Sequence, residues 1–253
     1  MMNLFSLKKD IVEVGRRVYA RGYVASNDGN ISARLDENRV VITPTGVSKG
    51  FMSMDEMVVV DMKGKVVGGG KKPSSEMFLH LEVYKHRADV NGIVHSHPPY
   101  ATGFAVAGIP LDKCILPEVI IVLGGIPLVE YGTPGTEEFY RPVIRIVDKH
   151  DAFLLANHGT LTLGKDVFNA YYKTETLEHF AHIAFVAQQL GAMNVLNREQ
   201  VQKLTDLREK FGITTGETCV TREDEGSCGC APDTDKEKLI REATDKVMKR
   251  LSK

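Results

Sequence analysis

Apolar positions along the chain follow two spacings, one typical of helices and one typical of strands. In the first segment Ile11, Val14 and Val18 recur every three or four residues and the pattern ends at Gly22, which predicts an N-terminal helix. By the same criteria helices are expected over residues 5–22, 75–88, 137–150, 166–190 and about 197–211. Residues 98–108 contain a further apolar helix start.

Short β-branched runs alternate with these helices and are bounded by Gly, Asn, Asp and Pro. They predict strands over residues 29–34, 39–42, 57–61, 91–95, 119–122, 127–130, 152–156 and 160–163. Helices and strands are intermixed along the chain, and no internal repeat is present. The expected architecture is therefore a single α/β domain.

The composition changes near residue 214. Beyond it come Thr, Gly, Glu and Asp, then Cys219, Cys228 and Cys230, and then a charged helical segment over residues 235–251. We therefore expect a catalytic domain over residues 1–212 and a cysteine-containing tail over 213–253, which we interpret as an appendage or a mobile flap. The tail cysteines could bind a metal or form a redox pair, although they lack the C-x-x-C pairs of a zinc knuckle.

The bulk composition narrows the class of protein. Of the 253 residues 43% are hydrophobic and 26% are charged, which is ordinary for a soluble globular protein. The formal net charge of −1 gives no global field that would favour nucleic acid or an anionic membrane. Lys and Arg interrupt the first apolar segment, which argues against a signal peptide, and Pro and Gly break the most apolar stretch, 114–131. The four cysteines indicate no disulfide framework, and a reducing cytoplasm is the simplest compartment.

Three histidines form the first candidate site. His95 and His97 are two residues apart on a predicted strand, so both imidazoles can face one ion. His158 follows a buried strand and precedes Gly159, which lets a ligand approach closely. Together they would supply the three imidazoles of a catalytic metal site with one open position. Core packing for the pair and a hydrogen-bonded turn for His158 remain as alternatives.

Small polar residues form a candidate anion site. Ser74 and Ser75 begin a predicted helix, where hydroxyls and free backbone N–H groups suit a phosphate, and Glu76 beside them could act as a general acid/base. The turns 28–32 and 43–46 offer similar donors. An ordinary helix cap and ordinary hairpin turns are the alternatives.

The order of these motifs resembles the class II aldolase/adducin family, and within it the sugar-phosphate aldolases of the L-fuculose-1-phosphate type. The resemblance rests on G-N-I-S, T-P-T-G, S-S-E, H-S-H-P and N-H-G, and it covers residues 5 to 195. It implies a mostly antiparallel central sheet between helices and a homotetramer with active sites at subunit interfaces.

The resemblance also implies a role for each candidate residue. His95, His97 and His158 would bind a catalytic zinc, with manganese or cobalt as alternatives, and Glu76 would be both acid/base and a ligand of the resting metal. Tyr131 would donate a proton in the neighbouring subunit's site. The residues implied in binding the substrate phosphate are Gly29, Asn30, Thr45, Gly46, Ser74 and Ser75.

The activity implied is reversible cleavage of a ketose 1-phosphate into dihydroxyacetone phosphate and an aldehyde. The apolar residues after Pro98 would suit a fuculose, 5-deoxyribulose or methylthioribulose 1-phosphate. Family epimerases typically carry Asp where this chain has Glu76, which favours the aldolase. A pentulose-5-phosphate 4-epimerase, a decarboxylase and a dehydratase of the family remain the alternatives. The non-enzymatic adducin branch lacks the metal histidines, all of which are present here. Among the other histidines, His80 and His86 are expected to be surface or packing residues. His179 and His182 share a face of the long helix and could bind metal, but a structural hydrogen-bonding role is the expectation.

Overall fold

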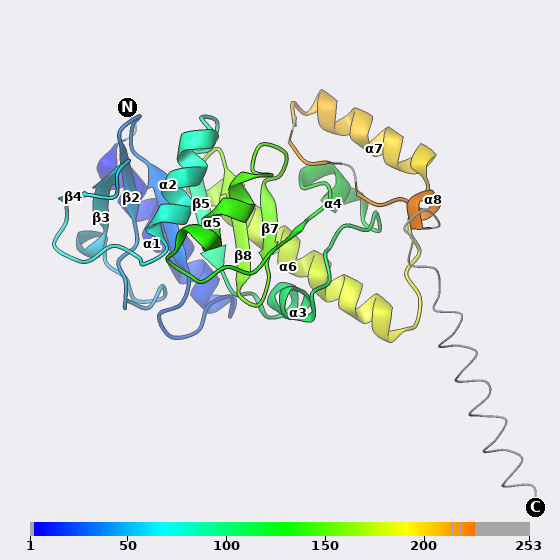
Figure 1. Cartoon of the computed structure of the whole chain (residues 1–253), viewed down its shortest axis with the longest axis horizontal. Helices are drawn as coiled ribbons and strands as arrows, with labels where there is room; N and C mark the ends of the chain where they lie inside the picture. Colours follow the sequence, from blue (N-terminus) through cyan, green and yellow to red (C-terminus); the bar gives the residue numbers. More distant parts are fainter. Residues whose placement is uncertain (1–2, 214, 218, 226–253) are drawn as a thin grey trace, which may run out of the picture.

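One eight-stranded sheet forms the centre of the molecule (Figure 1), in a computed structural model that describes residues 3–213, 215–217 and 219–225. The strand order is β4-β3-β2-β1-β5-β8-β7-β6, and every pairing is antiparallel except that of β6 with β7. The strands are β1 (Asn30–Arg34), β2 (Arg39–Ile42), β3 (Val58–Asp61), β4 (Val66–Gly68), β5 (Gly92–Ser96), β6 (Leu128–Val129), β7 (Ala152–Leu155) and β8 (Gly159–Gly164). The predicted mostly antiparallel sheet is confirmed.

Helices cover both faces of this sheet. The helices α2 and α5 pack on one face, and α1, α3, α4 and α6 pack on the other. The helices are α1 (Leu4–Ala20), α2 (Met77–His86), α3 (Pro99–Ala107), α4 (Pro117–Val122), α5 (Glu137–Ile144), α6 (Val167–Gln189), α7 (Arg198–Lys210) and α8 (Arg222–Glu225), with a 3-10 turn η1 (Met54–Glu56). The expected sandwich of a sheet between helices is therefore confirmed.

Alternation along the strands explains why both faces are covered. In β3 the side chains of Val58 and Val60 join the core under α2 and α5, whereas Val59 joins the core under α1. In β5 Ile93 and Val94 divide in the same way. Because successive side chains of a strand point to opposite faces, these apolar runs require a layer of helices on each side.

Residues 119–122 were expected to be a strand and instead lie in α4. Their β-branched side chains favour a strand, but Pro117 supplies helical φ in the first turn, and Val119 and Ile120 are buried against neighbouring helices. The helix expected over 75–88 is shorter and begins at Met77, because Glu76 rather than a serine is its N-cap residue. The helix expected over 137–150 ends at Ile144, and β4 was not expected.

The described part of the C-terminal segment packs on the body of the molecule. A disulfide joins Cys114 to Cys219, and both residues are buried together with Ile120, Val195 and Val201. The sequence did not predict this disulfide, because 105 residues separate the two cysteines. Cys228, Cys230 and the expected helix 235–251 lie outside the described residues.

The domain division at residue 212 and the cytoplasmic location both stay predictions. Among the described residues no helix is long and apolar enough to cross a membrane.

Candidate active site

Three imidazoles and one carboxylate meet at one end of the central strands. His95 lies at the end of β5, His97 directly follows it, His158 lies in the turn between β7 and β8, and Glu76 precedes α2. The Nε2 atom of His95 lies 3.1 Å from Nε2 of His97 and 3.0 Å from Nε2 of His158. The two carboxylate oxygens of Glu76 lie 3.1 Å from His95 Nε2 and 3.2 Å from His158 Nε2.

The turn that carries His158 depends on its two neighbours. Asn157 adopts a left-handed conformation with φ of 56°, which asparagine tolerates better than most residues. A Cβ atom at Gly159 would lie 2.5 Å from Cδ2 of His97 and 2.6 Å from the carbonyl oxygen of Ser96. Glycine is therefore required for this turn to pack against the strand that carries the other two histidines.

The charge state of the cluster suits a divalent cation. The Nδ1–H of His95 donates to the carbonyl of Thr160 at 2.8 Å, which leaves the lone pair of Nε2 facing the cluster. Burial lowers the pKa of His95 and of His97 to about 4, so both are neutral at pH 7. Burial alone would raise the pKa of Glu76, but His95, His158 and the amide of Asn30 outweigh it and hold that pKa well below its ordinary value.

These groups fit a metal ion. One ring nitrogen from each of the three histidines lies within 4.8 Å of the other two. Among the residues that the structure describes, these histidines form the cluster whose spacing could hold a metal ion. Neutral imidazole nitrogens beside a carboxylate are the donor set that catalytic zinc sites use, and a cation among them would offset the single negative charge.

A cleft of about 240 Å³ opens beside the cluster. The sequence-predicted metal and phosphate residues line it: Gly29, Asn30, Thr45, Gly46, Ser74, Ser75, Glu76, His95, His97 and His158. The structure therefore brings together every predicted site residue except Tyr131.

The cleft also contains a lysine that the sequence analysis missed. Lys49 is only 2% exposed, and its Nζ donates to the carbonyls of Asn27 at 2.9 Å and Val47 at 2.7 Å. It therefore ties together two of the loops that line the cleft, and burial lowers its pKa to about 8. No arginine and no other lysine is among the described residues of the lining. Its place three residues after the T-P-T-G motif was the available signal.

His80 is a second residue whose link to the site the sequence did not predict. It was expected at the surface or in packing; it is fully buried, and in addition its Nε2 lies 2.5 Å from the amide oxygen of Asn30. The amide nitrogen of Asn30 in turn donates to Glu76 at 2.8 Å. The four-residue spacing from Glu76 to His80 places both on one helix face, which was the signal in the sequence.

Tyr131 lies outside the cleft of its own chain. It is 61% exposed and lines a different cavity with Glu138 and Arg141. The loop that follows it passes close to the cleft, since a Cβ atom on Gly135 would lie 3.4 Å from the carbonyl oxygen of Ser75.

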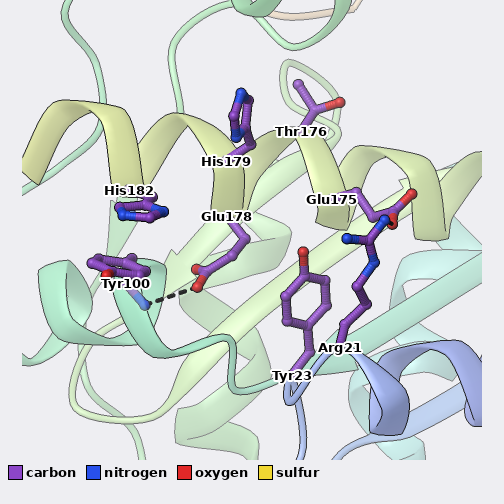
Figure 2. Close-up of a pocket in the computed structure, with 8 residues that line it drawn as sticks. All are labelled: Arg21, Tyr23, Tyr100, Glu175, Thr176, Glu178, His179 and His182. Atoms are coloured by element: carbon purple, nitrogen blue, oxygen red, sulfur yellow. Dashed lines mark hydrogen bonds and ion pairs between the residues drawn. The ribbon is translucent and has the colours of Figure 1, made fainter. Parts of the chain in front are cut away.

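A larger polar cavity of about 520 Å³ lies along α6 (Figure 2). His182 stacks on Tyr100 with ring centroids 3.9 Å apart, and Glu178 accepts the backbone N–H groups of Tyr100 and Ala101 at 3.0 and 2.8 Å. Glu178 thus satisfies the first turn of α3, directly after the metal-site histidines. His179 is exposed at the edge of the same cavity.

The sequence and the structure of this chain are both similar to those of known proteins of one family. Residues 9–185 match the model of the class II aldolase and adducin N-terminal domain. An L-fuculose phosphate aldolase of Methanococcus maripaludis is 36% identical over 72% of this chain and 97% of its own length. A 3-oxo-tetronate 4-phosphate decarboxylase of Haemophilus influenzae is 37% identical over 72% of this chain and 88% of its own. The solved structure of an L-fuculose 1-phosphate aldolase superposes with a TM-score of 0.75 at 31% identity, over 82% of this chain and 96% of that one.

Proposed function

The chain belongs to the class II aldolase and adducin family, and we propose that it is a zinc-dependent aldolase that cleaves a ketose 1-phosphate reversibly into dihydroxyacetone phosphate and an aldehyde. The observation that carries the proposal is the convergence of His95, His97 and His158 on one point, with the ionised carboxylate of Glu76 against two of them. Such a cluster has an open side toward the cleft, where a substrate would reach it.

Zinc, when bound by the three histidines, would supply Lewis-acid stabilisation of the negative charge that carbon–carbon cleavage leaves next to a ketone. Glu76 is the ionised group in position to take up and return a proton at the carbon of the dihydroxyacetone phosphate half. Its two oxygens face His95 and His158, so the carboxylate lies where it would adjoin a substrate held at the three histidines.

The cleft loops would hold the substrate phosphate. Thr45, Ser74 and Ser75 supply hydroxyls there, and backbone N–H groups at the start of α2 add favourable dipoles. Lys49 adds a positive charge behind these neutral donors, which a phosphate dianion favours. Gly29 and Gly46 take left-handed conformations, with φ of 73° and 72°, that let these loops turn tightly around an anion.

The exposed Tyr131 supports a role in a neighbouring subunit. We propose a homotetramer in which Tyr131 of one subunit serves the aldehyde oxygen in the cleft of the next, because its own cleft does not contain it.

The aldehyde half would be deoxygenated. The start of α3 presents Pro99, Tyr100, Gly103 and Phe104 around an apolar cavity of about 310 Å³ directly after the metal histidines. Such a lining favours a methyl or methylthio tail over a hydroxylated one, as in fuculose, 5-deoxyribulose or methylthioribulose 1-phosphate.

A decarboxylase acting on a sugar-acid phosphate is the second candidate, because a decarboxylase relative is as similar in sequence as the aldolase relative. Both reactions break a carbon–carbon bond beside a carbonyl and use the same metal and phosphate groups, so the cluster itself does not separate them.

A substrate panel separates the candidates. Zinc-loaded protein would be assayed with fuculose, 5-deoxyribulose and methylthioribulose 1-phosphates for dihydroxyacetone phosphate release, with ribulose 5-phosphate for epimerisation, and with a 3-oxo-tetronate 4-phosphate for carbon dioxide. We expect release from a deoxygenated ketose 1-phosphate and its loss in Glu76→Gln. Release of carbon dioxide together with dihydroxyacetone phosphate from the 3-oxo-tetronate 4-phosphate alone, with no dihydroxyacetone phosphate from any ketose 1-phosphate, would replace the aldolase with the decarboxylase.

A further inference from the structure

A continuous chain of buried hydrogen bonds leads from the core of the molecule to Glu76. Tyr84 Oη lies 2.9 Å from Ser32 Oγ, and Ser32 Oγ lies 2.7 Å from Nδ1 of His80. Nε2 of His80 lies 2.5 Å from Oδ1 of Asn30, whose Nδ2 lies 2.8 Å from Glu76 Oε2. The exposure of the four residues behind Glu76 is at most 3%.

The direction of each hydrogen bond in this chain follows from its last member. Glu76 is ionised and only accepts, so Nδ2 of Asn30 donates to it and Oδ1 of Asn30 faces His80. A carbonyl oxygen only accepts, so Nε2 of His80 carries the proton. Neutral His80 then accepts at Nδ1 from the hydroxyl of Ser32, which in turn accepts from the phenol of Tyr84.

The charge state of His80 agrees with this direction. Burial lowers the pKa of His80 to about 4, so the imidazole is neutral near pH 7 and has one donor and one acceptor nitrogen. A doubly protonated ring would have no acceptor for the Ser32 hydroxyl.

We infer that His80 is a positioning residue for Glu76: its Nε2–H fixes the amide of Asn30 so that the amide N–H, and not the amide oxygen, faces the carboxylate. Ser32 and Tyr84 hold the tautomer of His80 that this requires. The inference rests on the proposed role of Glu76 as acid/base. It also assigns the side-chain amide of Asn30 to the carboxylate of Glu76, whereas the sequence had predicted that Asn30 binds the substrate phosphate.

The fold makes this chain a rigid support. Asn30 and Ser32 lie two residues apart in β1 and share one face of the sheet, while His80 and Tyr84 lie four apart on α2. A reversed Asn30 amide would place Oδ1 against the Glu76 carboxylate and lose two hydrogen bonds. Partners of this kind around a metal site typically change affinity or activity by about 10- to 100-fold when they are removed.

The first test reads the tautomer and needs no substrate. Nitrogen-15 NMR of histidine-labelled, zinc-loaded protein at pH 7, assigned with His80→Gln, should show a protonated Nε2 and an unprotonated Nδ1 for His80. A proton on Nδ1, or on both nitrogens, would overturn the inference.

The second test uses kinetics and a conservative rescue. His80→Leu should lower kcat about 10- to 100-fold with little change in KM, because orientation of Glu76 is lost while the phosphate contacts remain. In His80→Gln the side-chain amide reaches about as far as Nε2 and can donate to Asn30, so kcat should return to within about 3-fold of the wild type.

His150→Leu is the matched control, because His150 is also a buried histidine, with its ring against the carbonyl of Gly125, and it lies outside the cleft. It should leave kcat unchanged. Equal loss in all three variants, or a change in KM alone, would overturn the inference. If the wild type cleaves no ketose phosphate, the proposed reaction fails, and the tautomer measurement still decides the hydrogen-bond chain.

Discussion

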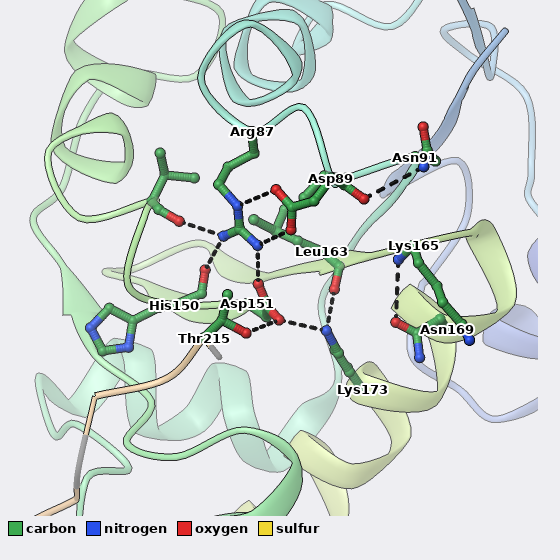
Figure 3. Close-up of polar contacts among 12 residues, drawn as sticks. Arg87, Asp89, Asn91, His150, Asp151, Leu163, Lys165, Asn169, Lys173 and Thr215 are labelled. Atoms are coloured by element: carbon green, nitrogen blue, oxygen red, sulfur yellow. Dashed lines mark hydrogen bonds and ion pairs between the residues drawn. The ribbon is translucent and has the colours of Figure 1, made fainter. Parts of the chain in front are cut away.

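Two clusters of charged residues, each largely buried apart from one exposed aspartate (Asp89 in the first), differ in how completely their charges are matched. In the first, Asp151 accepts from Arg87 at 2.9 Å and from Lys173 and Thr215 at 2.7 and 2.6 Å, and Arg87 also pairs with Asp89 at 2.7 Å (Figure 3). Two cations thus face two anions. The guanidinium of Arg87 holds the pKa of Asp89 below its ordinary value. Burial alone would raise the pKa of Asp151, but Lys173, Thr215 and Arg87 outweigh it and lower that pKa.

The second cluster is not balanced in this way. Glu76 lies against His95 and His158, and Asp28 lies 3.8 Å from His97. Neither His95 nor His97 carries a charge at pH 7, and Lys49 is the one cation among the described residues of the lining, so two carboxylates face a single cation.

The first cluster also lines a cavity, of about 390 Å³, but its donors already bind the two carboxylates and the backbone carbonyls of Val147 and Leu163. The imidazole lone pairs of the second converge on the cleft and have no such partners among the described residues. The difference indicates that the first cluster stabilises the fold, and it supports the proposal that the second binds a cation and substrate.

The largest expected effect is on the rate when the open cluster is changed. Glu76→Gln should lower kcat about 10²- to 10⁴-fold, the range for loss of a general acid/base, since the amide cannot take up a proton. Dihydroxyacetone phosphate release measures the rate, and thermal unfolding should stay close to the wild type. A variant that keeps its rate would remove Glu76 from the chemistry.

Stability should respond most when the closed cluster is broken. Asp151→Ala leaves Arg87 and Lys173 buried without their shared partner, so the free energy of unfolding should fall by about 3–5 kcal/mol. Urea unfolding measures this change. The kcat of the folded fraction should match the wild type, and a large drop in kcat at unchanged stability would reverse the assignment of the two clusters.

The disulfide should contribute to the stability of the region around Asp151 and not to the three-histidine cluster. Cys219→Ser frees the C-terminal segment that carries Thr215, and the expected loss of stability is about 2–4 kcal/mol. Reductant should destabilise the wild type by a similar amount and leave Cys219→Ser unaffected. An equal response of both proteins to reductant would place the redox effect elsewhere.

A smaller effect, on substrate binding, is expected when Lys49 in the cleft is replaced. Lys49→Met should raise KM for the phosphorylated substrate about 10- to 100-fold, because a hydrogen bond to a charged group contributes about 1.5–3 kcal/mol. Lys49→Arg, which keeps the charge, should be less affected.

The pH dependence gives the same residue a second test. Lys49 is protonated below its pKa of about 8, so phosphate affinity should be full below that pH and fall as the pH rises through it. The second pKa of a phosphate lies near 6, which leaves the ligand itself a dianion across this range. Lys49→Met should lack this decline, and an unchanged decline in the variant would assign it to another group.

The sequence predicted the parts of the site that follow local periodicity. His95 lies at the end of β5 and His97 follows two residues later, and His158 follows a buried strand, so each could be recognised within a few residues. For Lys49 and His80 the spacing was a signal of position but not of role, because their partners lie elsewhere: the carbonyl of Asn27 for Lys49 and the amide of Asn30 for His80.

For the fold too, local patterns were predictable from the sequence and contacts between distant segments were not. The alternation of strands such as β3 gave the two-sided sheet, whereas α4 was misjudged because its β-branched residues are helical only through packing against their neighbours. The pairing of Cys114 with Cys219 likewise depends on a contact across 105 residues, which no local pattern records.

The most direct test measures metal content and dihydroxyacetone phosphate release in the same preparation, as purified, after chelation and after zinc is restored. We expect one zinc per chain, release in proportion to zinc content, and loss of both in His97→Ala. Release that persists in metal-free protein, or zinc bound at full occupancy in His97→Ala, would contradict the assignment of the three-histidine cluster as the catalytic centre.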